Sequence, residues 1–306
     1  MTARRGFRHE ALIYSDADAF LAATAPFLRA ALEAGEPALV AVRRENTVLL
    51  EGELGKDAGA VRFADIEAFG RNPARIIPFW HEFVAGHGGK AVRGIGEPVW
   101  PGRATAEVDE CQRHESLLNV AFSRPPEWSL LCPYDAGGLD DAVLEKVACS
   151  HPVVEQVGVR GESGDYVAAV DCFAGELAER PDGGDTSEFD RTGLFDVRQR
   201  VEWAAKSARL PAQRTADLVL AASELAANSI VHGGGGGRLY VWRQGGSLLV
   251  EVEDRGSIAQ PLVGRERPTP TQVGGRGLWI ANQVCDLVQI RSGAAGTVVR
   301  LHMNID

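Results

Sequence analysis

The residues best able to do chemistry in this chain begin with Glu224 and Asn228, four positions apart in the stretch ASELAANSIVHG. If this stretch is helical, both side chains lie on one face. An amide oxygen is a suitable ligand for Mg²⁺ when phosphates supply most of the negative charge. A carboxylate one turn away can accept a proton from an attacking hydroxyl group or orient a water molecule. Taken alone, the pair is more typical of the polar face of a solvated helix. The motifs that follow decide between that interpretation and a catalytic pair.

A second motif, Asp254-Arg255-Gly256, follows the strand-like run LLVEVE. An aspartate at a strand end can accept a hydrogen bond from the amino group of adenine, and a glycine lets the base approach the backbone closely. Guanine presents an acceptor at the corresponding position, so the same carboxylate disfavours it. The alternative interpretation is an ordinary Asp-x-Gly turn.

A third motif is the glycine cluster GGRGLWI, residues 274–280, which opens a predicted helix. Backbone N–H groups at a helix start bind phosphate oxygens when no side chain obstructs them, and Arg276 can add a charge-assisted contact. Later in the chain, Gly296-Thr297 begins the last predicted strand, where the Thr297 hydroxyl can reach a base or a water beside it. The motifs together indicate a site for an adenine nucleotide.

Five consecutive glycines, Gly233 to Gly237, follow the predicted Glu224-Asn228 helix directly. Glycine runs are flexible and let a helix end turn tightly into a strand. The lysine and Ser/Thr of a phosphate-binding P-loop are absent here. We therefore expect the run to be a connector beside the nucleotide rather than a phosphate cradle.

The elements that position these motifs are predicted over residues 193–306. The polar and apolar pattern predicts helices on one side of an antiparallel-rich sheet, which is an α/β sandwich. The expected order is helix 196–208, a helix from Pro211 to His232, strands 238–243 and 247–253, a Gly/Pro-rich loop 254–274, helix 277–285, and strands 287–291 and 297–303.

The N-terminal half, residues 1–160, alternates strand-like and helix-like segments, which predicts an α/β domain with a mainly parallel sheet. Residues 161–192 are acidic and contain PDGGD, so we expect a linker with a short helix near 166–179. In the N-terminal half the expected strands are 11–14, 37–42, 92–95 and 128–132, and the expected helices are 16–34, 73–85 and 104–122.

Composition sets the broad class. The chain has 306 residues, of which 45% are hydrophobic and 24% charged, enough for two domains with their own cores. No apolar run is long enough to span a membrane, and the N-terminus has no signal-peptide pattern. Five unevenly spaced cysteines indicate reduced thiols in a cytoplasm. A net charge of −10 argues against nucleic-acid binding as the main activity.

The four motifs occur in the order and spacing of the GHKL ATPase superfamily, and residues 195–306 resemble its anti-sigma-factor kinase branch most. The resemblance implies binding of ATP and Mg²⁺. It implies that Asn228 holds Mg²⁺, Glu224 is the general base and Asp254 holds adenine. The full set of nucleotide-binding positions that it implies is Asn228, Asp254, Gly256, Gly275, Arg276, Gly277, Leu278 and Thr297.

The same resemblance implies protein partners. Such proteins bind a sigma factor and phosphorylate a serine or threonine of a small STAS-type anti-anti-sigma protein, commonly as homodimers. One alternative is a non-catalytic module that sequesters a sigma factor and uses ATP only as a switch. Another is a sensor histidine kinase, with His114 as phosphoacceptor about 110 residues before Asn228. That alternative needs long heptad-like helices between them, which the sequence lacks.

Residues 8–160 resemble the MEDS sensory domain, which implies a RecA-like fold and a small-molecule ligand. No Walker lysine follows the first turn, so we expect no ATP hydrolysis in this half. The phrases that carry the resemblance are HEALIY, LEAGEP, GEPVW, HESLLN, LCPYD and the dipeptide His151-Pro152.

Cysteines and histidines recur in this half, but their spacing is no recognised zinc pattern. Buried reduced cysteines and structural histidines are the simpler interpretation for Cys111, His114, Cys132, Cys149 and His151. Aromatic and histidine side chains of the MEDS-like phrases can equally line a ligand pocket or fill a core; these are His9, Tyr14, Trp100, His114 and Tyr134.

Overall fold

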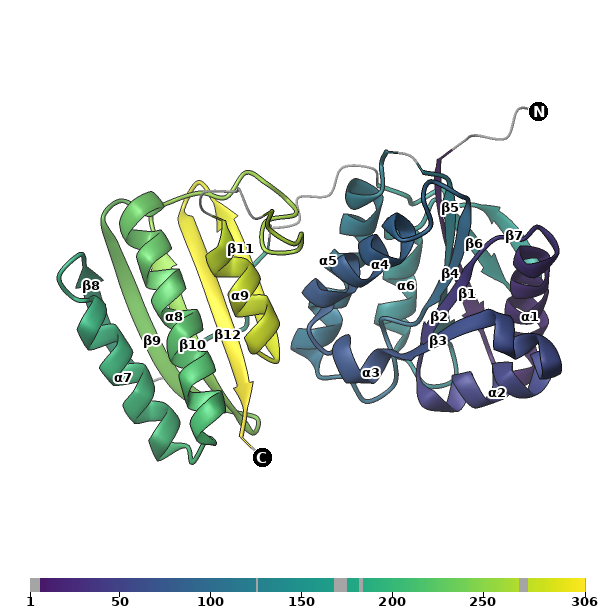
Figure 1. Cartoon of the computed structure of the whole chain (residues 1–306). Coiled ribbons are helices and arrows are strands. Elements are labelled where there is room, and N and C mark those ends of the chain that lie inside the picture. Colours follow the sequence, from purple (N-terminus) through teal and green to yellow (C-terminus); the bar gives the residue numbers. More distant parts are fainter. Residues whose placement is uncertain (1–5, 125, 168–174, 182–183, 270–274, 306) are drawn as a thin grey trace. The chain divides into compact units, whose positions relative to one another are not determined.

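The computed structural model describes residues 6–124, 126–167, 175–181, 184–269 and 275–305. The chain forms two compact units, Met1–Val170 and Asp171–Asp306, each built around its own sheet (Figure 1). Both units are α/β, one with a mainly parallel sheet and one with an antiparallel sheet, which confirms the predicted fold class. None of the described helices combines the length and the hydropathy that a membrane span needs.

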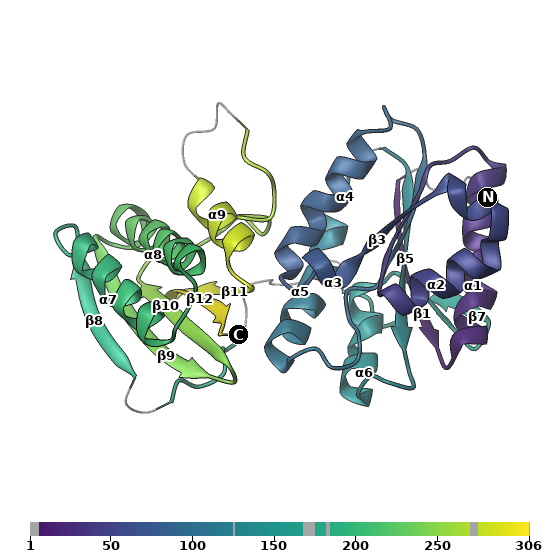
Figure 2. The same ribbon diagram turned by 60° about the horizontal axis from the view of Figure 1, so that its bottom comes forward.

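The sheet of the N-terminal unit has seven strands in the order β3-β2-β4-β5-β1-β6-β7. Its pairs are parallel except for β6 and β7. Helices cover both faces, with α1 and α2 on one side and α4, α5 and α6 on the other (Figures 1 and 2). The strands are β1 (Phe7–Tyr14), β2 (Ala38–Val42), β3 (Val61–Asp65), β4 (Val92–Gly96), β5 (Trp128–Asp135), β6 (Val153–Gln156) and β7 (Val159–Glu162). The helices are α1 (Ala17–Glu33), α2 (Arg44–Leu54), α3 (Ile66–Phe69), α4 (Ile76–Ala85), α5 (Thr105–Ala121) and α6 (Asp141–Ser150), with 3₁₀ turns η1 (Gly55–Ala60) and η2 (Pro73–Arg75).

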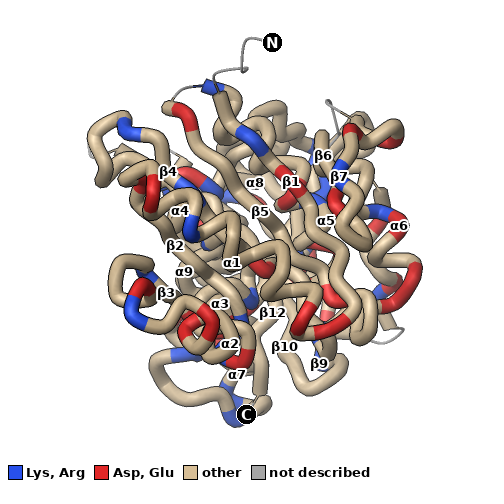
Figure 3. The backbone as a smooth tube through the Cα atoms, turned by 90° about the vertical axis from the view of Figure 1, so that its right-hand side faces the viewer, with Lys and Arg blue, Asp and Glu red and all other residues tan. Residues whose placement is uncertain are grey.

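Large aromatic side chains fill the core of this unit. Trp80 of α4 and Trp128 of β5 are both almost fully buried, with ring centroids 5.5 Å apart. Gly94 of β4 makes room for the Trp80 ring, because a Cβ atom there would lie 2.8 Å from it. On the side of this unit shown in Figure 3, Lys and Arg positions are scattered among Asp and Glu rather than gathered into one basic surface.

The C-terminal unit has a five-stranded antiparallel sheet in the order β11-β12-β10-β9-β8. The three helices described in this unit lie on one face of that sheet (Figure 2). Their apolar sides pack onto it through residues such as Val201, Leu225 and Ala281. The strands are β8 (Asp185–Asp190), β9 (Gly236–Gln244), β10 (Ser247–Asp254), β11 (Leu287–Gly293) and β12 (Gly296–Asn304), and the helices are α7 (Leu194–Ser207), α8 (Ala212–His232) and α9 (Arg276–Val284).

The segment expected to be a linker, 161–192, contains the end of one strand and the whole of another. Residues up to Glu162 belong to β7, and Asp185–Asp190 form β8, which pairs with β9 at one edge of the C-terminal sheet. Phe189 is the one buried residue of β8. The other residues of β8 can be polar or charged because β8 is an edge strand that faces solvent. Half of the helix expected near 166–179 falls on 168–174, which lie outside the described residues, and the other half, 166–167 and 175–179, is not helical.

One histidine of this sheet gives a stability prediction. Burial and the neighbouring charge of Arg300 lower the pKa of His302 to about 4, and His302 Nε2 lies 3.0 Å from Gln289 Oε1. The unfolded chain takes up this proton near pH 6.5, whereas the folded chain does not until about pH 4. The stability due to neutral His302 is therefore complete above pH 6.5 and is lost as the pH falls from 6.5 to 4.

Between pH 6.5 and pH 4, the free energy of unfolding of the wild-type protein should fall by up to about 3 kcal/mol more than that of His302→Gln. Urea unfolding of both proteins at a series of pH values measures the difference. A difference that stays constant with pH would contradict the prediction.

Candidate functional site

A cavity of about 410 Å³ opens in the C-terminal unit between α8, the ends of β10 and β12, and the start of α9. It gathers residues from all four sequence motifs. Six of the predicted site residues line it, namely Asn228, Asp254, Gly256, Gly275, Leu278 and Thr297. Apolar side chains form the rest of its wall, including Leu225, Val252, Ile258, Val263 and Val299. An apolar cavity with a few polar groups is typical of a small-molecule site.

Asp254, at the end of β10, is the polar anchor of this cavity. Its Oδ2 accepts a hydrogen bond from the Ser229 hydroxyl at 2.6 Å, and its Oδ1 accepts one from the Gly256 N–H at 2.7 Å. Each carboxylate oxygen therefore retains acceptor capacity. The donors fix the orientation of the carboxylate, which suits a ligand that offers an amino group, such as adenine.

Two positions near Asp254 must be glycine because neighbouring atoms lie too close for a side chain. A Cβ atom at Gly233, which ends α8, would lie 2.4 Å from the carboxylate carbon of Asp254. A Cβ atom at Gly256 would lie 2.6 Å from the carbonyl oxygen of His232. The first glycine of the five thus lets the carboxylate lie against the helix end.

Of the other four glycines in the run, two form the predicted connector and two belong to a strand. Gly234 and Gly235 have positive φ angles of 91° and 98°, which favour glycine, and they make the turn. Gly236 and Gly237 already belong to β9. A Cβ atom at Gly236 would lie 2.2 Å from the carbonyl oxygen of Phe189, so this glycine permits the pairing of β9 with β8.

Thr297 is buried at the start of β12 and links the cavity wall to the loop after β10. Its hydroxyl donates to the carbonyl oxygen of Gly256 at 2.9 Å and lies 2.7 Å from the Ser292 hydroxyl. Ser292 Oγ also accepts the N–H of Ile258. Sequence reasoning missed Ser229 and Ser292. Ser229 has a signal in the sequence, since it adjoins Asn228, whereas Ser292 has none.

Glu224 and Asn228 lie together on α8 beside the start of α9. A Cβ atom at Gly277 would lie 2.9 Å from Glu224 Oε2 and 3.1 Å from Asn228 Nδ2, so the missing side chain lets α9 approach both groups. Gly275 precedes α9 with a φ of 74°, and Arg276 is exposed in its first turn. The backbone N–H groups of this turn therefore lie close to the Glu224-Asn228 pair.

The apolar residues of α8 predict a buried side opposite Glu224 and Asn228, formed by Leu220, Leu225, Ile230 and Val231. Leu225 is buried and Ile230 is partly buried, but Leu220 and Val231 are 43% and 70% exposed. Leu220 is four residues before Glu224, and Val231 is three residues after Asn228. Helical periodicity therefore places both on the same side as the polar pair rather than opposite it.

The hairpin that carries Thr297 gives a matched pair of substitutions. Gly296 has a φ of 128°, and a Cβ atom there would lie 2.2 Å from the carbonyl oxygen of Asp254. We expect Gly296→Ala to lower the free energy of unfolding by about 2–4 kcal/mol. Gly293, its partner in the hairpin, has no atom within 4 Å of a Cβ position, so Gly293→Ala should change stability by less than about 0.5 kcal/mol. Urea unfolding measures both; equal effects would contradict the account of Gly296.

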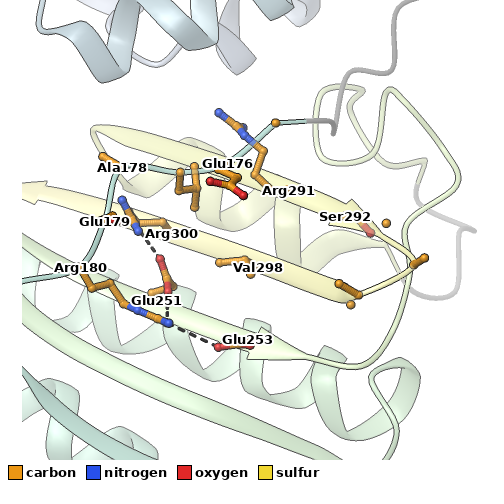
Figure 4. A pocket seen from close by; sticks show the side chains of 16 residues that line it. Glu176, Ala178, Glu179, Arg180, Glu251, Glu253, Arg291, Ser292, Val298 and Arg300 are labelled. Carbon is orange, nitrogen blue, oxygen red and sulfur yellow. Dashed lines mark hydrogen bonds and ion pairs between the residues drawn. The ribbon is translucent and has the colours of Figure 1, made fainter.

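A second cavity, of about 710 Å³, lies on the opposite face of the same sheet (Figure 4). Its charged groups are largely paired with one another. Glu251 accepts hydrogen bonds from Arg180 at 2.6 Å and from Arg300 at 2.7 Å, and Arg180 also lies over the Tyr240 ring. None of the nine predicted site residues lines this cavity, so it is not the site that the motifs build.

The N-terminal unit has a cavity of about 880 Å³ at the carboxyl ends of its parallel strands, where α/β sheets commonly bind ligands. Tyr14 and Arg43 line it. Beneath it, Glu97 accepts hydrogen bonds from Asn46 and from the backbone and side chain of Arg43. Burial raises the pKa of Glu97, and burial with the nearby Glu97 raises the pKa of Tyr14 to about 12. The other candidates for a pocket lining, His9, Trp100, His114 and Tyr134, are buried and absent from this wall.

Comparisons with known proteins identify both halves. Residues 8–152 match the family model of MEDS, the methanogen/methylotroph, DcmR sensory domain, and residues 190–303 match that of the histidine kinase-like ATPase domain. No curated protein matches the chain.

The similar solved structures include two that cover 40% of this chain. One contains the RsbU and RsbW domains of a Mycobacterium tuberculosis protein, with 21% identity, 32% of that chain covered and a TM-score of 0.30. The present chain therefore spans about a third of the length of that protein. The other is the Acinetobacter baumannii histidine kinase AdeS, with 12% identity, 68% of that chain covered and a TM-score of 0.24. The two matches place a MEDS domain in residues 8–152 and a histidine kinase-like ATPase domain in residues 190–303.

Proposed function

We propose that this chain is an ATP-dependent regulatory kinase of the anti-sigma type. It binds Mg-ATP in the C-terminal cavity and transfers the γ-phosphoryl group to a serine or threonine of a STAS-type anti-anti-sigma protein. The observation that carries the proposal is the convergence of Asp254, Asn228 and Thr297 on one cavity, with Glu224 beside it. An adenine site, a Mg²⁺ ligand and a general base are the parts that phosphoryl transfer requires.

Each role fits the local chemistry. Asp254 keeps acceptor capacity for the adenine amino group. The amide oxygen of Asn228 can complete the shell of a Mg²⁺ ion that the phosphates mostly hold. The first turn of α9 offers N–H groups to phosphate oxygens. Glu224 can take the proton of the attacking hydroxyl. Bound Mg²⁺ would neutralise charge on the phosphates during transfer.

The buried position of His114 favours this proposal over a sensor histidine kinase. A phosphoacceptor histidine must reach the γ-phosphate, so it needs an exposed position on a helical hairpin. His114 is fully buried in α5, inside the α/β unit. A hydroxyl substrate on another protein avoids this obstacle.

The regulatory part of the proposal rests on the partners. The kinase domain would bind a sigma factor, as a homodimer, and hold it from transcription. Phosphorylation of the STAS protein would weaken that antagonist and leave the sigma factor bound. A small molecule in the N-terminal unit, for which the cavity beside Tyr14 and Arg43 is a candidate site, would control this exchange.

Phosphotransfer from labelled Mg-ATP tests the proposal, with STAS proteins of the same genome offered as substrates. Label on a STAS serine or threonine that is lost in Asn228→Ala would support it. Gln213→Ala is a matched control, since Gln213 is an exposed amide on the same helix, bonded to Asp217 and remote from the cavity. Label on a histidine of this chain would favour the histidine kinase. ATP binding without any transfer would favour the sequestering module.

A further inference from the structure

Four buried side chains meet inside the N-terminal unit, and none of them lines any of the three cavities described above. His9 of β1, Glu115 of α5, Cys132 of β5 and His151 after α6 place one ligand atom each within 4.8 Å of one another. His9 Nε2 and His151 Nε2 lie 3.0 and 2.9 Å from Glu115 Oε2. Cys132 Sγ lies 3.4 Å from His9 Nε2. No member of this cluster is more than 2% exposed.

The fold explains why residues so distant in the sequence meet. Strands β1 and β5 are parallel neighbours, and Cys132 is in register with Ala11, two residues after His9. His9 and Cys132 therefore point to the same face of the sheet. Helices α5 and α6 cover that face and bring Glu115 and His151 to it (Figure 1).

Hydrogen bonds outside the cluster hold the Nδ1 protons of both histidines. His151 Nδ1 donates to the carbonyl oxygen of Val147 at 2.8 Å. Asn119 Nδ2 donates to the carbonyl oxygen of Ser150 at 2.8 Å, so its Oδ1 faces His9 Nδ1 at 3.2 Å and accepts that proton. Nε2 is therefore the atom that each histidine directs into the cluster.

Nε2 of both histidines lies within 3.0 Å of one carboxylate oxygen of Glu115, an atom that can only accept. These contacts need positive charge at Nε2, either as a second proton on each imidazole or as one divalent ion that all the ligand atoms share. A single ion satisfies both histidines, Glu115 and Cys132 at once. Outer-shell partners that hold the Nδ1 protons of two histidines are the usual support of metal ligands.

A nucleophilic cysteine is a poorer account of the same atoms. In a Cys-His-carboxylate relay, one imidazole nitrogen contacts the thiol and the other contacts the carboxylate. Here Cys132 and Glu115 both face Nε2 of His9, while its Nδ1 faces Asn119. The sulfur is also closed off from substrates, because Cys132 is 1% exposed.

We propose that His9, Glu115, Cys132 and His151 bind one divalent ion of the zinc type. Two imidazoles, a carboxylate and a thiolate form a closed tetrahedral set, with bonds of about 2.0–2.3 Å. Those bonds separate ligand atoms by roughly 3.3–3.8 Å. The ligand atoms here lie between 2.9 and 4.8 Å apart, so the short pairs must open and the long pairs must close by about 1 Å or less. On binding, the Cys132 S–H bond breaks, its proton passes to solvent and the thiolate coordinates the ion.

Because the four ligands leave no open position, the site is structural or sensory rather than catalytic. This inference is independent of the kinase activity proposed for the C-terminal unit.

Cobalt titration of the full-length, chelator-treated protein tests the site. We expect one Co²⁺ per chain, with the intense visible bands of tetrahedral cobalt and a thiolate-to-metal charge-transfer band in the near ultraviolet. Zn²⁺ should displace the cobalt and remove both signals. A wild-type protein that binds no cobalt, or that gives the weak bands of six-coordinate cobalt, would overturn the proposal without any variant.

Variants then assign the ligands. Cys132→Ser should abolish the charge-transfer band and weaken binding by more than about 100-fold, whereas Cys149→Ser, which removes an exposed thiol, should change neither. Asn119→Leu should weaken binding about 10- to 100-fold and keep the charge-transfer band, because Asn119 positions His9 without touching the ion. Far-ultraviolet circular dichroism checks that each variant is folded. A charge-transfer band that persists in a folded Cys132→Ser protein would overturn the assignment.

Discussion

Replacing Glu224 by glutamine is expected to slow phosphotransfer to the STAS substrate by about 10²- to 10⁴-fold while leaving ATP affinity nearly unchanged. Glutamine keeps the shape of the side chain but cannot accept the proton of the attacking hydroxyl. Affinity should persist because Glu224 is not part of the cavity wall that holds Asp254 and Thr297. Single-turnover transfer and equilibrium ATP binding, measured on the same preparation, separate the two effects.

A neighbouring carboxylate provides the control for this experiment. Asp217 lies on α8 about two turns before Glu224 and is bonded to Gln213 rather than facing the cavity. Asp217→Asn makes the same change in charge on the same helix and should transfer at the wild-type rate. If both variants lose transfer equally, the effect is one of helix charge. If neither does, Glu224 is not the base, and the sequestering module becomes the better account.

The second large effect is expected from Asp254→Asn, which should weaken ATP binding by about 10- to 100-fold, or roughly 1.4–2.7 kcal/mol. Both carboxylate oxygens already accept hydrogen bonds, from Ser229 and from the Gly256 N–H. An amide at this position has one oxygen, and the Gly256 N–H competes for it. The amide nitrogen then meets the amino group of adenine, donor against donor.

The same substitution should shift the preference between bases. Guanine presents a carbonyl oxygen at the corresponding position, so the ratio of GTP affinity to ATP affinity should rise in Asp254→Asn. Ser229→Ala is the graded comparison, since it removes one donor to Asp254 and leaves the carboxylate in place. Ser229→Ala should weaken ATP binding several-fold at most, and the ratio of GTP affinity to ATP affinity should stay unchanged. Equal ATP affinity in wild type and Asp254→Asn would exclude Asp254 as the adenine contact.

The sequence predicted the C-terminal elements well because their periodicity is regular and their ends carry clear signals. Pro211 precedes α8 and Gly233 ends it, so the predicted and observed helices agree to one residue. Strand β8 was missed because five of its six residues are polar or charged, and its identity depends on pairing with β9, about 50 residues away. In the N-terminal half, β3 was missed for a similar reason, since only Val61 of that strand is buried.

The two candidate sites differ in how far sequence could reach them. The cavity residues lie in short contiguous motifs, so local reasoning found them. Ser292 joins them only through its contacts with Thr297 and Ile258, which form when the chain folds. The histidine and cysteine cluster could not be found in this way. Its ligands come from four elements that are separated by 17 to 106 residues, and only the register of β1 with β5 brings the first and third together.

Strand β8 also sets the shortest fragment of this chain that can serve as an independent ATPase domain. The backbone of β9 gives its outer hydrogen bonds to β8 from Asp185 to Asp190. A domain boundary chosen from the motifs alone would start the fragment at residue 193. In such a fragment, the backbone N–H and C=O groups of β9 that pair with β8 have no partner strand. Bare sheet edges pair with other chains, so such a fragment is prone to edge-to-edge association and aggregation. Segment 185–190 is therefore an integral part of the domain, and tags or fusions belong before it.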